Sequence, residues 1–233
     1  MIVSIHQPHF FPWLGYFNKV LNSDVFVWLE SVQYRKNYFQ NRTRIKCSDS
    51  RLQWLTVPVH APLGTPINRV LIADPRWRMK VEKTIEQSYG KAPYFAVIWP
   101  KLRFALSSAP PKLEALNSLT FNAVMQLLGG KQPRIVRDGE LAVMSQHPTG
   151  RLVEICQRLG ATHYLAGKGS RNYLRVEEFR DKNIEVLSQH FDVTRVTYAQ
   201  RNDSFVPGLS VLDCLFNVGP AETQRLVQNG WKP

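Results

Sequence analysis

The first 30 residues constrain the fold most, because they contain a strand, a helix and a second strand in close succession. Residues 2–5 are an apolar run typical of a short buried strand, residues 13–21 carry apolar positions at helical spacing, and residues 25–29 form a second apolar run. Two strands joined through a helix run parallel, so their carboxyl ends lie at the same edge of a sheet. The opening therefore predicts a parallel α/β sheet.

The alternation of strands and helices returns in the second half of the chain, and this predicts the fold class. We expect a single α/β domain over residues 1–233, with a mostly parallel Rossmann-like sheet flanked by helices. A helical or loop insertion is expected at about residues 60–130, and a nucleotidyltransferase-like topology is compatible with this order. Further strands are predicted at residues 54–59, 162–166 and 184–187, and helices at 78–89, 94–106, 113–128, 151–159, 176–182, 209–217 and 221–227.

Cysteine usage and hydropathy exclude several classes of protein. The three cysteines, Cys47, Cys156 and Cys214, are odd in number and too widely spaced for a disulfide framework or a zinc knuckle. No apolar run approaches the ~20 residues that cross a bilayer, and the N-terminus lacks a signal-peptide pattern. We expect a cytoplasmic protein without membrane insertion, metal or other cofactor. The oligomeric state is left open.

The positive charge of the chain is concentrated in one third of its length. Of a formal net charge of +12, residues 35–103 contribute +10, from 14 Lys and Arg against 4 Asp and Glu. Cations interleaved with aromatic residues can neutralise phosphates and stack on bases, so this region predicts a phosphate-rich partner such as tRNA, DNA or a nucleotide sugar. A solvated basic face is the structural alternative. The cations expected to contact phosphate here are Arg35, Lys36, Arg44, Lys46, Arg76, Arg78 and Lys80.

The turn after the first strand carries the residues best suited to chemistry. His6 and Gln7 directly follow that strand, and Glu30 follows the second one. Because ligands bind outside the carboxyl ends of strands in open α/β sheets, we expect one site here, with His6 and Glu30 as candidates for moving a proton. A tight turn with buried, backbone-bonded histidines is the alternative. Further candidate substrate-binding residues are His9, Tyr16, Gln33, Tyr34, Asn41 and Arg42.

A second glycine-containing turn follows the strand predicted at residues 162–166. Gly167 and Gly169 flank Lys168, and Arg171 follows, so the turn can present backbone N–H groups and two cations to a phosphate or carboxylate. It lacks the P-loop pattern, and an ordinary loop is an equal alternative. No Ser/His/Asp, Cys/His or paired-carboxylate hydrolase pattern can be read from the sequence.

These motifs together resemble the WbqC-like family. The resemblance covers roughly residues 1–60 and 160–220, and the His-Gln-Pro opening is its most specific part. One departure is Glu30, where the family pattern leads us to expect Asp. The residues that carry the resemblance are His6, Gln7, Pro8, Phe11, Pro12, Gly15, Tyr16, Lys19, Asp24, Gln33, Tyr34, Asn41, Arg42, Gly167, Tyr173, Gln200, Phe205, Pro207, Ser210, Asp213, Asn217 and Gly219.

The resemblance implies acyl or aminoacyl transfer to an amino sugar, because members of the family are encoded largely in loci for surface polysaccharide. It also adds Tyr173 and Asp213 to the candidate substrate-binding residues. We therefore expect a transferase that forms an amide on an amino sugar or on a nucleic-acid-borne group, with aminoacyl-tRNA as a candidate donor. Two hypotheses stay open beside it: a non-catalytic nucleic-acid-binding module, and a nucleotidyltransferase-like enzyme in which residues 13–16, Trp-Leu-Gly-Tyr, replace the His-x-Gly-His turn.

Overall fold

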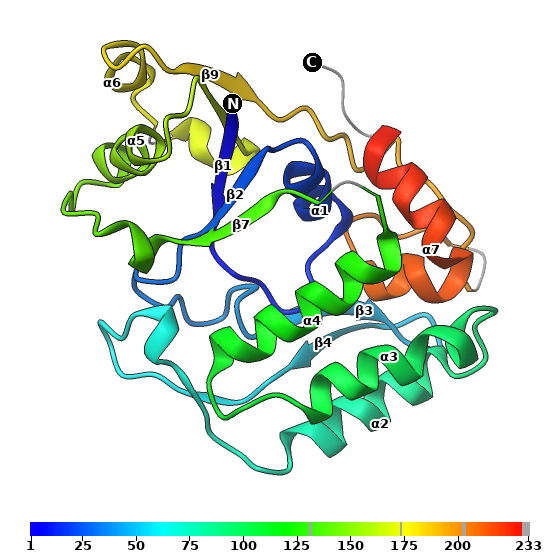
Figure 1. The fold of residues 1–233 in the computed structure, drawn as a ribbon. Helices are drawn as coiled ribbons and strands as arrows, with labels where there is room; N and C mark the ends of the chain where they lie inside the picture. Colours follow the sequence, from blue (N-terminus) through cyan, green and yellow to red (C-terminus); the bar gives the residue numbers. More distant parts are fainter. Residues whose placement is uncertain (131, 173, 202–203, 230–233) are drawn as a thin grey trace.

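The computed structural model describes residues 1–130, 132–172, 174–201 and 204–229. Its centre is a five-stranded sheet in which all neighbouring strands are parallel (Figure 1). The expected α/β fold class, a mostly parallel sheet flanked by helices, is confirmed. The strands lie in the order β7-β2-β1-β8-β9 and comprise β1 (Ile2–His6), β2 (Val25–Trp28), β7 (Arg134–Arg137), β8 (His163–Ala166) and β9 (Glu185–Ser188).

The strand order reverses direction beside β1. From β1 the chain adds β2 and β7 on one side, and then crosses over to add β8 and β9 on the other side. In open α/β sheets such a reversal leaves a crevice at the carboxyl ends of the two central strands, where ligands bind. A ligand is therefore expected between His6, at the end of β1, and Ala166, at the end of β8.

Helices cover both faces of the sheet (Figure 1). Successive residues of a strand pack alternately against the helices on one face and on the other. Phe26 and Trp28 of β2 belong to one apolar core with α1 (Leu14–Leu21), α4 (Leu113–Leu128) and α7 (Val211–Asn229). Val25 and Val27 face the other layer, which contains α5 (Pro148–Arg158) and α6 (Val176–Arg180). This period of two follows from the pleat of a β-strand, and it buries the sheet on both sides.

The connection from β2 to β7 is long and carries its own secondary structure. It contains an antiparallel hairpin of β3 (Arg42–Lys46) and β4 (Leu52–Thr56) and a second pair of β5 (Val59–His60) and β6 (Leu71–Ile72). In Figure 1 the hairpin lies beyond the carboxyl edge of the sheet, so this connection can close one side of the crevice. Its helices are α2 (Trp77–Tyr89), α3 (Phe95–Ser107) and α4.

Three strands lie outside the sequence-based prediction: the two-residue β6, and the charge-rich β7 and β3. β7 reads Arg-Ile-Val-Arg, of which only Val136 is buried, and β3 reads Arg-Thr-Arg-Ile-Lys, with Thr43 and Ile45 buried between half-buried arginines. In β7 and β3, charged residues interrupt the apolar run from which a strand is predicted. The helices expected at residues 209–217 and 221–227 are parts of α7, which Gly219 interrupts with a φ of 80°.

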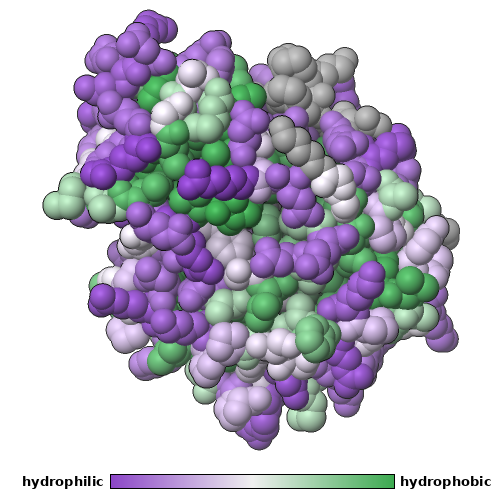
Figure 2. All heavy atoms as spheres, in the orientation of Figure 1, coloured by the Kyte–Doolittle hydropathy of each residue, from purple (hydrophilic) through white to green (hydrophobic). Residues whose placement is uncertain are grey.

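The described residues contain no helix that combines the length and the apolar character needed to cross a bilayer. The face of the molecule shown in Figure 2 is mostly hydrophilic, with smaller hydrophobic areas interspersed.

Candidate functional site

The site begins where β1 and β8 separate. Only the first two residues of β8 pair with β1, whereas β1 pairs with β2 as far as His6. The carbonyl groups of Ile2 and His6 accept hydrogen bonds at the β2 side. Because carbonyl directions alternate along a strand, the carbonyl of Ile5 points toward β8, where no strand residue continues the ladder.

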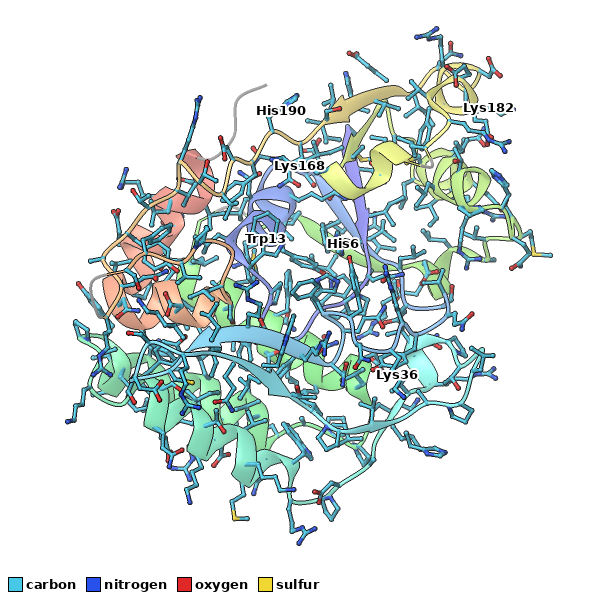
Figure 3. The ribbon with its side chains drawn as sticks, turned by 180° about the vertical axis from the view of Figure 1, so that it is seen from behind. His6, Trp13, Lys36, Lys168, Lys182 and His190 are labelled. Carbon is cyan, nitrogen blue, oxygen red and sulfur yellow. The ribbon has the colours of Figure 1, made fainter. Side chains whose placement is uncertain are left out.

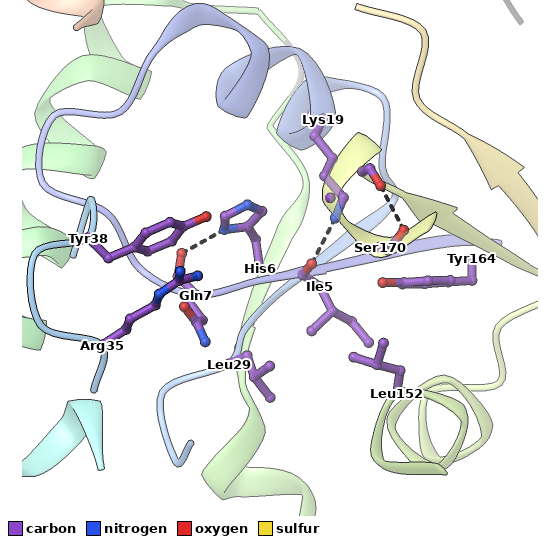
Figure 4. Close-up of a pocket in the computed structure, with 12 residues that line it drawn as sticks. Ile5, His6, Gln7, Lys19, Leu29, Arg35, Tyr38, Leu152, Tyr164 and Ser170 are labelled. Carbon is purple, nitrogen blue, oxygen red and sulfur yellow. Dashed lines mark hydrogen bonds between the residues drawn. The ribbon is translucent and has the colours of Figure 1, made fainter. Parts of the chain in front are cut away.

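Lys19 occupies that position. This residue of α1 is only 3% exposed, and its Nζ donates a hydrogen bond of 2.8 Å to the carbonyl oxygen of Ile5 (Figure 4). The ring of Tyr164 lies 5.9 Å from the same nitrogen. Burial lowers the pKa of Lys19 to about 7. An amine with this pKa is present in both its charged and its neutral form near neutral pH, which suits proton transfer.

Two adjoining pockets meet at Lys19. The outer pocket has a volume of about 290 Å³ and the inner chamber has a volume of about 190 Å³. The outer pocket also includes Gln7, Arg35 and Ser170, and the inner chamber includes His9, Trp13, Tyr16, Phe39, Lys168 and Gln189. Figure 3 shows His6, Trp13 and Lys168 around this edge of the sheet, away from Lys182 at the periphery. The residues common to both pockets are His6, Lys19, Tyr38, Gly167 and Gly169.

His6 is neutral and presents an acceptor. Its Nδ1 lies 2.9 Å from the carbonyl oxygen of Gln7, and since that oxygen can only accept, Nδ1 carries the proton and Nε2 carries the lone pair. Burial, and secondly the charge of Lys19, lower the pKa of His6 to about 3. At neutral pH His6 can therefore orient a substrate donor, but it is a weak base beside Lys19.

A chain of side-chain contacts holds the mouth of the outer pocket. The Oε1 of Gln7 accepts from Gln40, 2.8 Å away, and Gln40 in turn accepts from the backbone N–H of Arg35 at 2.8 Å. The amide nitrogen of Gln7 is thereby left as a donor in the pocket. The Arg35 guanidinium lies 4.6 Å from the centre of the Tyr38 ring, so a cation stands beside the entrance (Figure 4).

The turn after β8 forms the opposite wall. Ser170 donates through its backbone and its hydroxyl to the carbonyl oxygen of Gly167, and this closes the turn. A Cβ at Gly167 would lie 3.8 Å from the Nζ of Lys19 and 3.9 Å from the Oε1 of Gln189, so the missing side chain keeps the space between them open. Lys168 is exposed beside it. The side chain of Arg171, and Tyr173 as a whole, lie outside the described residues.

Glu30 does not line either pocket. Its carboxylate forms an ion pair of 2.5 Å with Arg137, which also pairs with Glu114 at 2.9 Å. The backbone N–H of Glu30 donates to Asp138. Burial raises the pKa of Glu30 while the hydrogen bond and charge of Arg137 oppose that shift. The structure thus places Glu30 in a network that joins β2, β7 and α4, and not beside His6 in the pocket.

Four other predicted binding residues line neither the outer pocket nor the inner chamber. Tyr34 donates to the Oδ1 of Asn41 at 2.8 Å, and both line a pocket of about 410 Å³ with Lys36. Asn41 also donates to the carbonyl oxygen of Val57 at 2.8 Å. These bonds hold the hairpin. Gln33 is exposed, and the Arg42 guanidinium stacks 4.0 Å above the Trp54 ring.

Asp213 is buried at the start of α7. It accepts from the hydroxyls of Tyr89 at 3.0 Å and Tyr198 at 2.8 Å, and it lines neither the outer pocket nor the inner chamber. Lys46, also buried, donates to the carbonyl oxygen of Ser204. Burial raises the pKa of Asp213. Both residues therefore serve a polar cluster between α7 and β3, apart from the pockets.

Six of the predicted phosphate-binding cations fall into two groups. On α2 and the turn before it, Arg76 and Lys80 pair with Asp74, and Arg78 pairs with Glu82. Acidic partners thus offset part of that charge. In contrast, Arg35 and Lys168 line the outer pocket and the inner chamber, and Lys36 is exposed on the same loop as Arg35. Arg44 is half-buried on β3.

The sequence placed Lys19 only among the residues that carry the family resemblance, and Tyr38 only among the aromatic residues between the cations of residues 35–51. The structure brings both to the site together with Gln189. The signal for Lys19 was a lysine in a helix whose other positions are nearly all apolar, because such a helix buries every face. Gln189 has no local signal; it directly follows β9 and donates to the Gly15 carbonyl at 2.7 Å. Within the described residues, no three His, Cys, Asp or Glu side chains gather as a metal centre requires.

The structure defines an α/β protein with a polar pocket at the switch point of a parallel sheet, and sequence comparison identifies its family. The pattern of the WbqC-like protein family matches residues 7–225, so the chain belongs to that family. A protein of Mycobacterium tuberculosis (strain ATCC 25618 / H37Rv), described as uncharacterized protein Rv1507c, is 35% identical over 222 residues, covering 93% of this chain and 94% of its own. No solved structure matches the chain significantly.

Proposed function

We propose that the protein is an acyl- or aminoacyltransferase that forms an amide on an amino-bearing substrate. The single observation that carries the proposal is Lys19, a buried amine with a pKa of about 7 that lines both pockets beside a neutral imidazole. Amide formation needs a group that takes a proton from an attacking amine near neutral pH. Lys19 meets this requirement better than His6 or Glu30.

The proposed reaction needs only the acyl donor and the amine. The amine nitrogen attacks the carbonyl carbon of an ester or thioester, a C–N bond forms, and the C–O or C–S bond to the leaving group breaks. The proton from the amine passes to the Nζ of Lys19 and then to the leaving oxygen or sulfur. The Nε2 of His6 accepts a hydrogen bond from the amine, and the amide nitrogen of Gln7 donates to the developing oxyanion.

Cations at the two pockets fit a donor or acceptor that carries phosphate. Arg35 stands at the mouth of the outer pocket and Lys168 at the inner chamber, on opposite walls. A phosphate backbone passing between them would be neutralised from both sides. An aminoacyl-tRNA donor, a nucleotide-linked amino sugar or a nucleic acid bearing an amine each has such a group. All three occur in the cytoplasm, where we place the protein.

The test is mass spectrometry of reaction products. Purified protein is incubated with amino sugars or amine-bearing nucleic acid, and with aminoacyl-tRNA or acyl-CoA as donor. We expect a mass gain of one acyl group on one acceptor, and its loss in Lys19→Met. Lys182→Met, which removes an exposed lysine far from the pockets, is the matched control and keeps full activity.

One result supports the alternative of a non-catalytic binding module. If no donor yields a product, while nucleic acid binds equally to the wild type and to Lys19→Met, the transferase proposal is rejected. Retained transfer in Lys19→Met would reject Lys19 as the proton acceptor.

A further inference from the structure

The side-chain amide of Gln189 borders the inner chamber, and hydrogen bonds to α1 hold it in place. Its Nε2 donates to the carbonyl oxygen of Gly15 at 2.7 Å and to the Oδ1 of Asn18 at 2.8 Å. The Nδ2 of Asn18 in turn donates to the carbonyl oxygen of Val227 at 2.7 Å. Both hydrogens of the Gln189 amide are therefore used within the protein.

These partners fix the direction of the Gln189 amide. A backbone carbonyl can only accept, so the nitrogens of both amides must face their carbonyl partners. The Oε1 of Gln189 is thus left on the side of Gly167, and within the described part of the chain no group donates to it. Gln189 is 7% exposed. Buried polar groups are nearly always paired, so this fixed acceptor calls for a ligand that donates.

The Oε1 of Gln189 and the Nζ of Lys19 border the same small space beside Gly167. A Cβ on Gly167 would lie 3.9 Å from the oxygen and 3.8 Å from the nitrogen, so the two atoms are at most 7.7 Å apart. Two hydrogen bonds of about 2.8 Å each take up most of that span. A ligand that meets both atoms therefore has its polar groups on neighbouring carbons, whereas a longer spacer has to fold back on itself.

The lining of the chamber limits which group can donate to Gln189. Lys19 and Lys168 both line it, so a further cation beside the oxygen is disfavoured. A carboxylate or a phosphate dianion has no hydrogen to donate, whereas a hydroxyl donates without bringing a charge. The rings of Trp13 and Phe191, 5.5 Å apart between centres, line the same chamber and offer apolar faces to a carbon ring.

We infer that Gln189 is a specificity-determining residue, whose Oε1 accepts a hydrogen bond from a hydroxyl group on the carbon next to the one that bears the reacting amine. The inference rests on the proposed function, in which that amine lies beside Lys19. It selects a ring with an amine and a hydroxyl on neighbouring carbons over a plain amine. An amine without that hydroxyl leaves the Oε1 of Gln189 unpaired.

Binding of two ring amines of similar shape tests the inference. The probe trans-2-aminocyclohexanol has the hydroxyl, and cyclohexylamine lacks it. Affinities for the full-length protein are measured by ligand-observed NMR titration at pH 9, where Lys19 is neutral. We expect the amino alcohol to bind about three- to ten-fold more tightly, which is the net effect of one hydrogen bond. A third probe, trans-4-aminocyclohexanol, has its hydroxyl farther from the amine and should bind like cyclohexylamine.

Two variants separate a direct contact from a structural role. Gln189→Met removes the acceptor and should abolish the preference for the amino alcohol, with the affinity for cyclohexylamine little changed. Asn18→Ala removes one bond that holds the same amide but leaves the Oε1 and the bond to Gly15, so the preference should remain. A preference that persists in Gln189→Met, or equal binding of the three probes by the wild type, would overturn the inference.

The probes need no acyl donor, so their binding is independent of transfer. Transfer to a plain amine, together with equal binding of the probes, would reject the role of Gln189 and leave the transferase proposal standing. If the preference is present and is lost in Gln189→Met, but no donor yields a product, the transferase proposal is rejected and Gln189 remains a hydroxyl-binding residue.

Discussion

The Nζ of Lys19 lies 2.8 Å from the carbonyl oxygen of Ile5 and donates to it, at the point where β1 and β8 part. Lys19 of α1 thus supplies the hydrogen bond that β8 does not give to this carbonyl of β1. Lys19 lines both pockets, so one residue contacts the backbone of β1 and borders the site. This relationship fixes where a titratable amine stands relative to any ligand in the crevice.

The first prediction concerns the pH dependence of activity. Since the base is the neutral amine of Lys19, with a pKa of about 7, kcat/KM should rise about ten-fold per pH unit below pH 7 and level off above it. Lys19→Met should lower kcat by roughly 10²–10⁴-fold and remove this inflection. Steady-state rates from pH 5 to 9 provide the measurement. An inflection that persists in Lys19→Met would assign the titration to another group.

The second prediction concerns stability. The pKa of Lys19 is about 7 in the folded protein and about 10.4 in the unfolded chain, so the unfolded chain binds the proton more tightly between these values. The free energy of unfolding should therefore gain roughly 1.4 kcal/mol per pH unit from this group between about pH 7 and 10, and nothing below pH 7.

Urea unfolding of the wild type and Lys19→Met across that pH range measures this contribution. The variant should lose the slope that Lys19 supplies, because methionine does not titrate. At pH 7 the free energies of unfolding of the two proteins should differ little. The variant no longer pays for the buried charge of Lys19, but it loses about 1–3 kcal/mol because the Ile5 carbonyl has no hydrogen-bond donor. Parallel pH profiles for the two proteins would contradict the assignment.

The third prediction concerns Gly167. An alanine Cβ would meet Lys19 and Gln189 only at ordinary contact distances, so Gly167→Ala should change the free energy of unfolding by no more than about 0.5 kcal/mol. It should lower substrate affinity at least ten-fold, because the methyl group occupies the space that the two pockets share. Gly139→Ala, with no atom near its added Cβ, is the control. Unimpaired binding by Gly167→Ala would show that ligands do not use this wall.

The fourth prediction concerns the ion pairs of Glu30. Arg137→Ala leaves the buried carboxylate of Glu30 and the half-buried one of Glu114 without their cation and should cost about 3 kcal/mol in chemical unfolding. Glu30→Gln should cost less, since an amide oxygen still accepts from Arg137. Because Glu30 lies outside the pockets, we expect Glu30→Gln to keep transfer activity within a few-fold. A loss of 10²-fold or more would restore Glu30 as a catalytic candidate.

The fifth prediction concerns nucleic-acid binding. Each cation that contacts a phosphate steepens the dependence of log affinity on log salt by about 0.7–0.9. Arg35→Gln and Lys168→Gln should each reduce that slope by about this amount, measured by fluorescence polarisation with tRNA. Lys80→Gln is the comparison, because Lys80 already pairs with Asp74, and it should leave the slope nearly unchanged. Equal slopes in all three variants would place the phosphate contacts elsewhere.

The sequence predicted the elements whose residues are apolar at a regular period. The β1–α1–β2 unit could be read directly, because Val25 and Val27 face one core and Phe26 and Trp28 face the other, so the whole strand is apolar. β7 could not be read in this way. Its arginines interrupt the apolar pattern, and the strand is recognised only by its pairing with β2. Arg137 forms ion pairs with Glu30 and Glu114, which lie far from it in the sequence or on another element.

The amino-acid sequence by itself determined the parallel α/β class, the family and the position of the His-Gln turn at the end of the first strand. Tertiary structure alone decided which side chains meet there. The separation of β1 from β8 leaves one carbonyl without a strand partner, and Lys19 and Gly167, 148 residues apart in the chain, come together around that gap. The local pattern of apolar residues indicates which face of a helix or strand is buried. It does not indicate which backbone group, distant in the sequence, a side chain of that element will hydrogen-bond.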